Sequence, residues 1–227
     1  MTAWDRFTDS FFNARVMAQY LPKIIEGFGL TVVLALCIIV AGLALGLLLA
    51  LVRAFAIRPL NWLIIFYIDF FRSIPQLVLI VLAYFALPYF GLVLEPFTAT
   101  VLALAIVLSA FSEEIFWAGI NAVAKGQWEA GRSTGLSFTR TLAYIILPQV
   151  VRMSIPPLTN RAIGISKGTT LGSVVAVPEL LNVTSSIQSN VANPTALTVG
   201  ALLFLLLFLP FVRFTRWLEH AYAHPRS

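Results

Sequence analysis

Residues 27–52 contain no Asp, Glu, Lys or Arg, and this apolar run constrains the fold more than any other feature of the chain. A helix needs roughly 20 apolar residues to cross a hydrocarbon core about 30 Å thick. Four more apolar segments follow, at residues 73–94, 96–112, 152–178 and 197–212. The sequence therefore predicts an all-α integral membrane protein with about five transmembrane helices.

The composition places the chain in the same class. Hydrophobic residues make up 59% of the chain and charged residues only 11%, whereas soluble domains average about 25% charged residues. The formal net charge of +5 does not indicate nucleic-acid binding, because membrane proteins carry a surplus of Lys and Arg on their cytoplasmic side. We therefore expect the lipid bilayer, and no nucleic acid, as a partner.

The basic residues predict the orientation of the chain. The connections near 91–95 and 178–194 have no Lys or Arg. The other connections and the C-terminal end carry them, at Arg53, Arg58, Lys125, Arg132, Arg140, Arg213, Arg216 and Arg226. By the positive-inside rule, the C-terminus lies in the cytoplasm and the N-terminus in the periplasm.

Three regions follow from this pattern. Residues 1–22 are an N-terminal periplasmic or interfacial segment, residues 23–218 the transmembrane domain, and residues 219–227 a cytoplasmic tail. In the first region Phe7, Phe11, Phe12 and Val16 are spaced for an amphipathic helix at the membrane interface, and a frayed terminus is the alternative.

Two local features concern the first two spans. Gly42, Gly46 and Ala50 form a stripe of small residues that would let another helix approach closely. Charged residues and a proline at 69–75 predict a helix break, which we expect near the cytoplasmic side.

The connection at residues 124–144 is too polar to span the membrane, and we expect it to hold one or two short helices. It is either a surface for a partner protein or an ordinary connector. The order of its residues is informative, since Glu129-Ala130-Gly131 precedes Gly135 by a fixed interval and Ile145, Leu147 and Pro148 follow. This spacing resembles the cytoplasmic signature of permeases of bacterial ATP-binding-cassette (ABC) importers.

The resemblance covers roughly residues 20–220 and is to the polar amino acid uptake branch, which includes histidine, glutamine and glutamate permeases. The residues that carry it include the stretches 71–75, 114–120, 125–130, 147–152, 156–160 and 167–171. Gly131 departs from the usual alanine, a small-for-small change. Trp117 stands where the family usually has Arg, and Arg161 stands near a position that is commonly acidic or an amide.

The resemblance implies the type I importer permease fold in the bacterial inner membrane. It also implies a second permease, identical or paralogous, two ATPase subunits and a periplasmic substrate-binding protein. The residues that couple to the ATPase would be Glu129, Ala130, Gly131, Gly135, Ile145, Leu147 and Pro148. This chain has no Gly-x-x-x-x-Gly-Lys-Ser/Thr loop, so ATP and Mg²⁺ are expected on the partner ATPase, with no cofactor in this chain.

Charged and polar residues within the spans are candidates for the substrate path, because charges there are costly. They are Glu114, Arg161, Lys167, Thr169 and Thr170. Arg161 either forms a structural ion pair with Glu114 or faces an anionic substrate such as an acidic amino acid or related carboxylate. The two threonine hydroxyls either line the path or bond their own backbone.

No catalytic or metal site is expected. Cys37 is isolated in the first span, and His220 and His224 lie in the basic tail. The function that the resemblance implies is ATP-driven import of a polar amino acid by a transport subunit that is not itself an enzyme. A membrane channel or scaffold subunit without ATPase coupling is the alternative.

Overall fold

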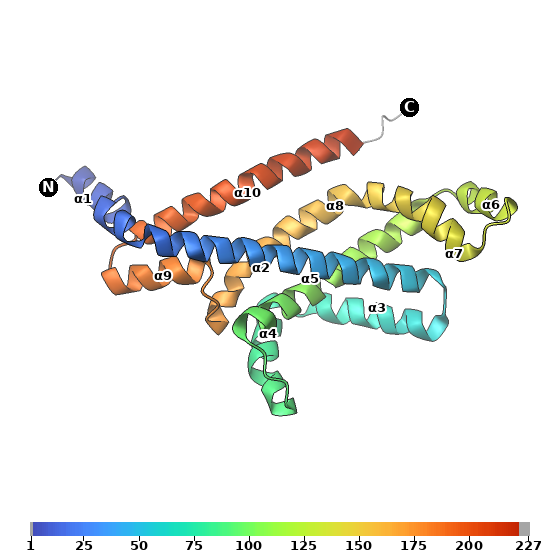
Figure 1. The fold of residues 1–227 in the computed structure, drawn as a ribbon, viewed down its shortest axis with the longest axis horizontal. Coiled ribbons are helices and arrows are strands. Elements are labelled where there is room, and N and C mark those ends of the chain that lie inside the picture. Colours follow the sequence, from blue (N-terminus) through green and yellow to red (C-terminus); the bar gives the residue numbers. More distant parts are fainter. Residues whose placement is uncertain (1, 223–227) are drawn as a thin grey trace. The chain divides into compact units, whose positions relative to one another are not determined.

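The computed structural model describes residues 2–222, and within this range the chain is helical with no strand (Figure 1). The α-helices are α1 (Ala3–Phe11), α2 (Ala14–Ala54), α3 (Arg58–Ser73), α4 (Gln76–Val81), α5 (Pro96–Ala122), α6 (Lys125–Ser133), α7 (Phe138–Thr141), α8 (Leu147–Lys167), α9 (Leu180–Val191) and α10 (Thr195–Tyr222). Two π-helical segments, Leu82–Ala86 and Leu142–Ile146, and two 3₁₀ segments, Leu87–Phe90 and Gly168–Val175, complete the order. The last five residues of the predicted tail, 223–227, lie outside the described residues.

Three helical stretches of the described chain are long and apolar enough to cross a membrane: Ala3–Ala54, Pro96–Ala122 and Thr195–Trp217. Two bent pairs pass the same test together. They are Arg58–Ser73 with Gln76–Phe90, bent by 103°, and Phe138–Val175 with Leu180–Val191, bent by 47°. Counting each bent pair as one span gives five, the number expected from the apolar segments.

The break between α3 and α4 occurs at Ile74 and Pro75, where the proline predicts it. Ile74 and Pro75 have extended ψ angles of 131° and 134°, because proline disfavours helical geometry in the residue before it. The sixteen residues of α3, about 24 Å of helix, separate this break from the basic turn before Arg58. The expectation that this break lies near the cytoplasmic side of the membrane stays a prediction.

Both π-helical segments have the same sequence context. Leu-Ala-Tyr begins each segment, and Leu-Pro follows it, ending at Pro88 in one case and Pro148 in the other. A proline inside a helix has no N–H to donate and its ring collides with the carbonyl four residues earlier. The wider π-turn accommodates this mismatch, so the chain runs from α7 through the second π-turn into α8 without a loop.

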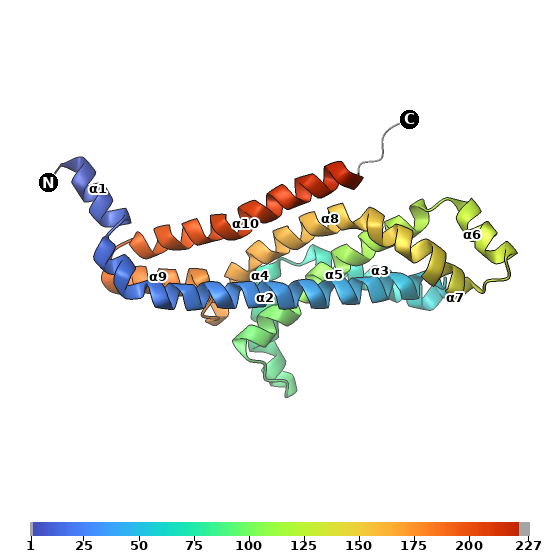
Figure 2. The same ribbon diagram turned by 45° about the horizontal axis from the view of Figure 1, so that its top comes forward.

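The chain divides into two compact units. The first comprises residues 1–38, 75–104 and 165–211, and the second comprises residues 39–74, 105–164 and 212–227. In the first unit α9 packs along the beginning of α2, with Ile24 against a core that includes Leu180 and Ile187. Figures 1 and 2 both show these two helices side by side.

The second unit contains the C-terminal halves of α2 and α5, with α3, α6, α7 and most of α8. The predicted small-residue stripe on α2 is confirmed as a close helix crossing here. A Cβ atom on Gly42 would lie 2.7 Å from Leu108, and one on Gly46 would lie 2.6 Å from Ser112. Because both positions lack a Cβ, α2 and α5 approach closely enough for Arg53, near the end of α2, to reach Glu113 inside α5.

Candidate functional site

The polar connection forms the helices α6 and α7, which confirms the expectation of one or two short helices. The turn between them depends on Gly135, whose φ of +85° is a left-handed conformation that glycine adopts without strain. The Leu136 N–H donates to the Gly131 carbonyl at 3.2 Å, and this bond closes the end of α6. Ser137 then caps α7 by accepting from the Arg140 N–H.

The seven predicted coupling residues have different positions around this connection. Glu129 and Ala130 are exposed on α6, whereas Gly131 is buried and faces the π-turn that holds Ile145. Leu147 and Pro148 form the first turn of α8. The structure thus brings Gly131 and Ile145 into contact and leaves Glu129 and Ala130 free of the core.

Gly131 occupies a tighter place than the sequence comparison with alanine suggested. A Cβ atom there would lie 2.7 Å from Thr141 Cγ2 and 2.8 Å from Ile145 Cδ1. Alanine therefore does not fit at this position unless the neighbouring side chains move, and the interpretation of Gly131 as a harmless small-for-small change needs correction. Helix α6 packs directly against α7 because this residue has no side chain.

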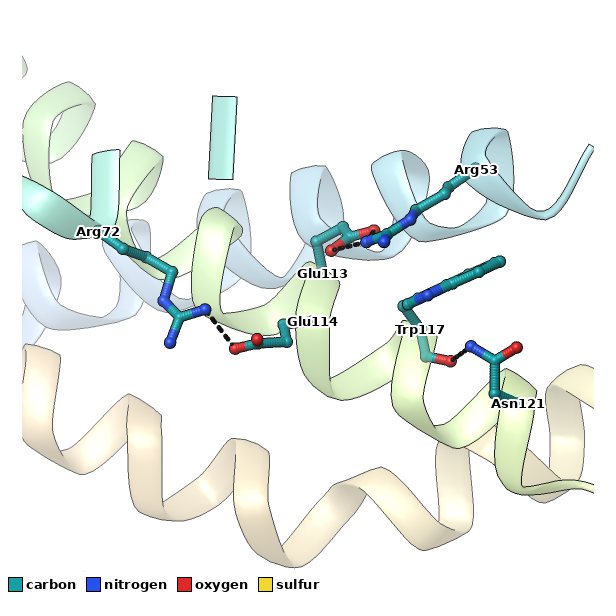
Figure 3. Close-up of polar contacts among 6 residues, drawn as sticks. All are labelled: Arg53, Arg72, Glu113, Glu114, Trp117 and Asn121. Carbon is teal, nitrogen blue, oxygen red and sulfur yellow. Dashed lines mark hydrogen bonds and ion pairs between the residues drawn. The ribbon is translucent and has the colours of Figure 1, made fainter. Parts of the chain in front are cut away.

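Two ion pairs hold adjacent carboxylates of α5 to different helices (Figure 3). Nη1 of Arg53, at the end of α2, lies 3.0 Å from one Glu113 oxygen and 3.2 Å from the other. Nη1 of Arg72, at the end of α3, lies 2.6 Å from Glu114 Oε2. Adjacent helix residues point about 100° apart, so the two carboxylates reach arginines on two different helices.

The two pairs differ in burial. The Glu113 side chain is fully buried and that of Arg53 is 17% exposed, whereas the Arg72 and Glu114 side chains are 33% and 52% exposed. The hypothesis of a Glu114–Arg161 ion pair is wrong, because the described residues contain no such pair and Glu114 pairs with Arg72 instead. The guanidinium beside Trp117 comes from Arg53, 4.5 Å from the ring centre.

Arg161 lies in the same unit and contacts an aromatic ring. Its guanidinium carbon is 3.7 Å from the centre of the Phe111 ring, and that of Arg72 is 4.9 Å from the same centre. Neither ion pair of the described residues includes Arg161. The Phe111 ring therefore contacts the guanidinium groups of both Arg72 and Arg161, and Glu114 pairs with that of Arg72.

The other three candidates for the substrate path, Lys167, Thr169 and Thr170, belong to the first unit. Thr169 donates to the Ser166 carbonyl and Thr170 to the Lys167 carbonyl, which is the backbone-bonded alternative left open by the sequence. The Lys167 ammonium lies 5.8 Å from the centre of the Phe208 ring. Their helix turn is crowded, since a Cβ on Gly168 would lie 2.7 Å from Gln76 Oε1.

Sequence reasoning missed Glu179, a fully buried carboxylate at the start of α9. It accepts hydrogen bonds from the Leu181 and Asn182 N–H groups at 2.9 and 2.7 Å and from the Ser173 hydroxyl at 2.6 Å. These bonds satisfy helix-terminal donors that would otherwise be buried without partners. An acidic residue between Pro178 and an apolar run was the available signal, because carboxylates commonly cap helix N-termini.

Comparison with known proteins identifies the family of this chain. Residues 42–224 match the family model described as "Binding-protein-dependent transport system inner membrane component". The probable amino-acid ABC transporter permease YckA of Bacillus subtilis is 36% identical over 75% of both chains, and the probable glutamine ABC transporter permease GlnM of the same organism is 33% identical over 91% of this chain and 96% of its own. The glutamine transport permease GlnP of Escherichia coli is 36% identical over 70% of this chain and 74% of its own.

Solved structures agree with these relatives. The crystal structure of an amino acid ABC transporter with histidines superposes with a TM-score of 0.80 at 33% identity, covering 90% of this chain and 96% of that one. An inward-facing MetNI methionine transporter matches with a TM-score of 0.60 at 19% identity, covering 90% of this chain and 98% of that one, and supports the type I fold alone. The chain therefore belongs to the binding-protein-dependent inner-membrane transport family and is a multi-pass permease subunit of an amino-acid ABC importer.

Proposed function

We propose that this permease couples ATP hydrolysis on a separate ATPase subunit to import of an amino acid delivered by a periplasmic binding protein. Helix α6 is the proposed contact with the ATPase, in a complex with two ATPase subunits and a second permease, identical or paralogous. The observation that supports this role is the exposure of Glu129 and Ala130 on a helix whose other side is packed at Gly131. A helix held in this way can transmit a push to α7 and α8 as a nearly rigid body.

The coupling proposal is tested by co-purification of the co-expressed ATPase. Glu129→Lys reverses the charge on the exposed side of α6, and we expect it to lower ATPase recovery. Glu95→Lys reverses the charge of an exposed carboxylate in the connection before α5, outside α6 and α7, and serves as the matched control. Full ATPase recovery with Glu129→Lys, together with unchanged uptake, would contradict a coupling role for α6.

The orientation proposed with this function has the N-terminus in the periplasm and the C-terminus in the cytoplasm. The boundaries remain 1–22, 23–218 and 219–227, although α2 begins at Ala14 and α10 continues to Tyr222. Helix α1 carries exposed aromatic rings of Trp4, Phe7 and Phe11, which suit a membrane interface. In a Cys37→Ala background, an impermeant maleimide should label Thr2→Cys from the periplasm and Ser133→Cys only after permeabilisation.

For the substrate, we propose that Arg161 favours an acidic amino acid or related carboxylate. The supporting observation is that Glu114 pairs with Arg72 while Arg161 lies on Phe111, outside both ion pairs of the described residues. A guanidinium presents a fork of donors that matches a carboxylate. Glu114, Lys167, Thr169 and Thr170 remain candidates for the same path.

Uptake by the reconstituted complex tests this assignment. Arg161→Gln should lower glutamate uptake relative to glutamine uptake, whereas Arg152→Gln, an exposed arginine on the same helix, should change neither. An equal loss for both substrates would indicate a structural role for Arg161. Unchanged glutamate uptake would contradict the substrate assignment.

A further inference from the structure

The turn between α2 and α3 carries exposed apolar side chains outside the regular helices. Phe55 is 46% exposed and Ile57 is 51% exposed, on either side of Ala56. The turn has a defined backbone, because Ala56 has a φ of +56° and the Phe55 and Ala56 N–H groups donate to the Val52 and Arg53 carbonyls. Ile57 is therefore presented in a fixed position.

An aromatic chain joins this turn to the connection that holds α6. The Phe55 ring meets the edge of Phe138 with centroids 5.6 Å apart, and Phe138 stacks on Trp128 of α6 at 5.3 Å. All three residues belong to the second unit, so the turn and α6 form one continuous surface. Phe55 is thus connected to α6 by two ring contacts, and a partner that covers α6 can also reach the turn.

The irregular backbone of the turn also indicates that the turn does not lie in the hydrocarbon core of the membrane. Backbone groups at helix ends lack helical partners, and lipid tails offer none. The first residue of α3 after the turn and the helices α6 and α7 expose four basic side chains, Arg58, Lys125, Arg132 and Arg140, and one carboxylate, Glu129. A partner that covers this surface needs an apolar patch with acidic residues around it.

We propose that the α2–α3 turn is a second docking element for the ATPase subunit, with Ile57 as its apolar contact and α6 as its neighbour. This inference rests on the proposed coupling function of α6. The proposal commits to the ATPase because the turn is continuous with the coupling helix through Trp128, Phe138 and Phe55. Phospholipid headgroups share the anionic chemistry and are the alternative that the experiment must distinguish.

Site-specific photocrosslinking in membranes that contain the co-expressed ATPase tests the proposal. A photoreactive phenylalanine analogue is placed at position 57, at position 130 on α6, and at position 66 on α3, where Phe66 is 65% exposed. We expect adducts with the ATPase at 57 and 130 and none at 66. An adduct at 130 but only phospholipid adducts, or none, at 57 would overturn this inference and leave the coupling proposal intact.

No ATPase adduct at position 130 would instead overturn the proposed function, which makes the two failures distinguishable. A substitution gives an independent measurement. Ile57→Ser should weaken ATPase co-purification roughly tenfold, as expected for losing an apolar side chain buried at an interface. Val93→Ser, an exposed β-branched residue in a connection without basic residues, is the matched control and should have no effect. An equal result for the two variants would overturn the assignment of Ile57.

Discussion

Replacing Arg53 by Met is expected to destabilise the protein much more than replacing Arg72 by Met, although the two arginines pair with adjacent carboxylates. The difference follows from burial, since the Glu113 side chain is fully buried and the Glu114 side chain is 52% exposed. Removing one partner of a buried pair leaves an uncompensated charge and costs about 3–5 kcal/mol. Breaking an exposed pair costs about 1 kcal/mol or less.

Thermal unfolding of the purified subunit in detergent measures this difference. We expect the melting temperature of Arg53→Met to fall by roughly 10 °C, and that of Arg72→Met by no more than about 3 °C. The double variant Arg53→Met/Glu113→Met removes both charges and keeps similar side-chain volumes. It should therefore recover most of the lost stability, because the unpaired buried carboxylate is gone.

Two results would refute this reasoning. Equal losses for Arg53→Met and Arg72→Met would mean that burial does not control the strength of these pairs. A double variant Arg53→Met/Glu113→Met that is no more stable than Arg53→Met alone would mean that the cost does not come from the unpaired charge. The cation–π contact of Arg53 with Trp117 would then be the stronger candidate for the lost stability, and Trp117→Leu would test it.

Two further predictions concern other tightly packed positions. Gly131→Ala should destabilise the junction of α6 and α7 by about 1 kcal/mol net, because overpacking of about 2 kcal/mol exceeds the gain in helix propensity of about 1 kcal/mol. Thr141→Ser removes one of the two side-chain groups that the new Cβ would meet and leaves Ile145 Cδ1, so the double variant should regain part of the lost melting temperature. No gain at all would show that the contact with Thr141 is not limiting. Glu179→Ala should lower the free energy of unfolding by about 2 kcal/mol, because it removes a buried helix cap. Hydrogen exchange of the Leu181 and Asn182 amides should accelerate selectively, and uniform protection across α9 would contradict this prediction.

Much of the structure of the connection at residues 124–144 was predictable because its signals are local. Gly135 lies in a turn that requires positive φ, and the polar residues around Glu129 cannot lie in a hydrocarbon core. The pairing of the charges was not predictable. The sequence suggested Arg161 as the partner of Glu114, and only the packing of α3 against α5 shows that the partner is Arg72.

The sequence by itself determined that the chain crosses a membrane, how many apolar segments it has, and where proline interrupts them. These properties depend on the cost of exposing polar groups to lipid and on the geometry of single residues, so they act over short stretches of chain. Only the tertiary structure decided the close fit at Gly131 and the burial of Glu113 and Glu179. Each of these depends on which helices meet, because van der Waals overlap and desolvation are set by neighbours that are distant in sequence.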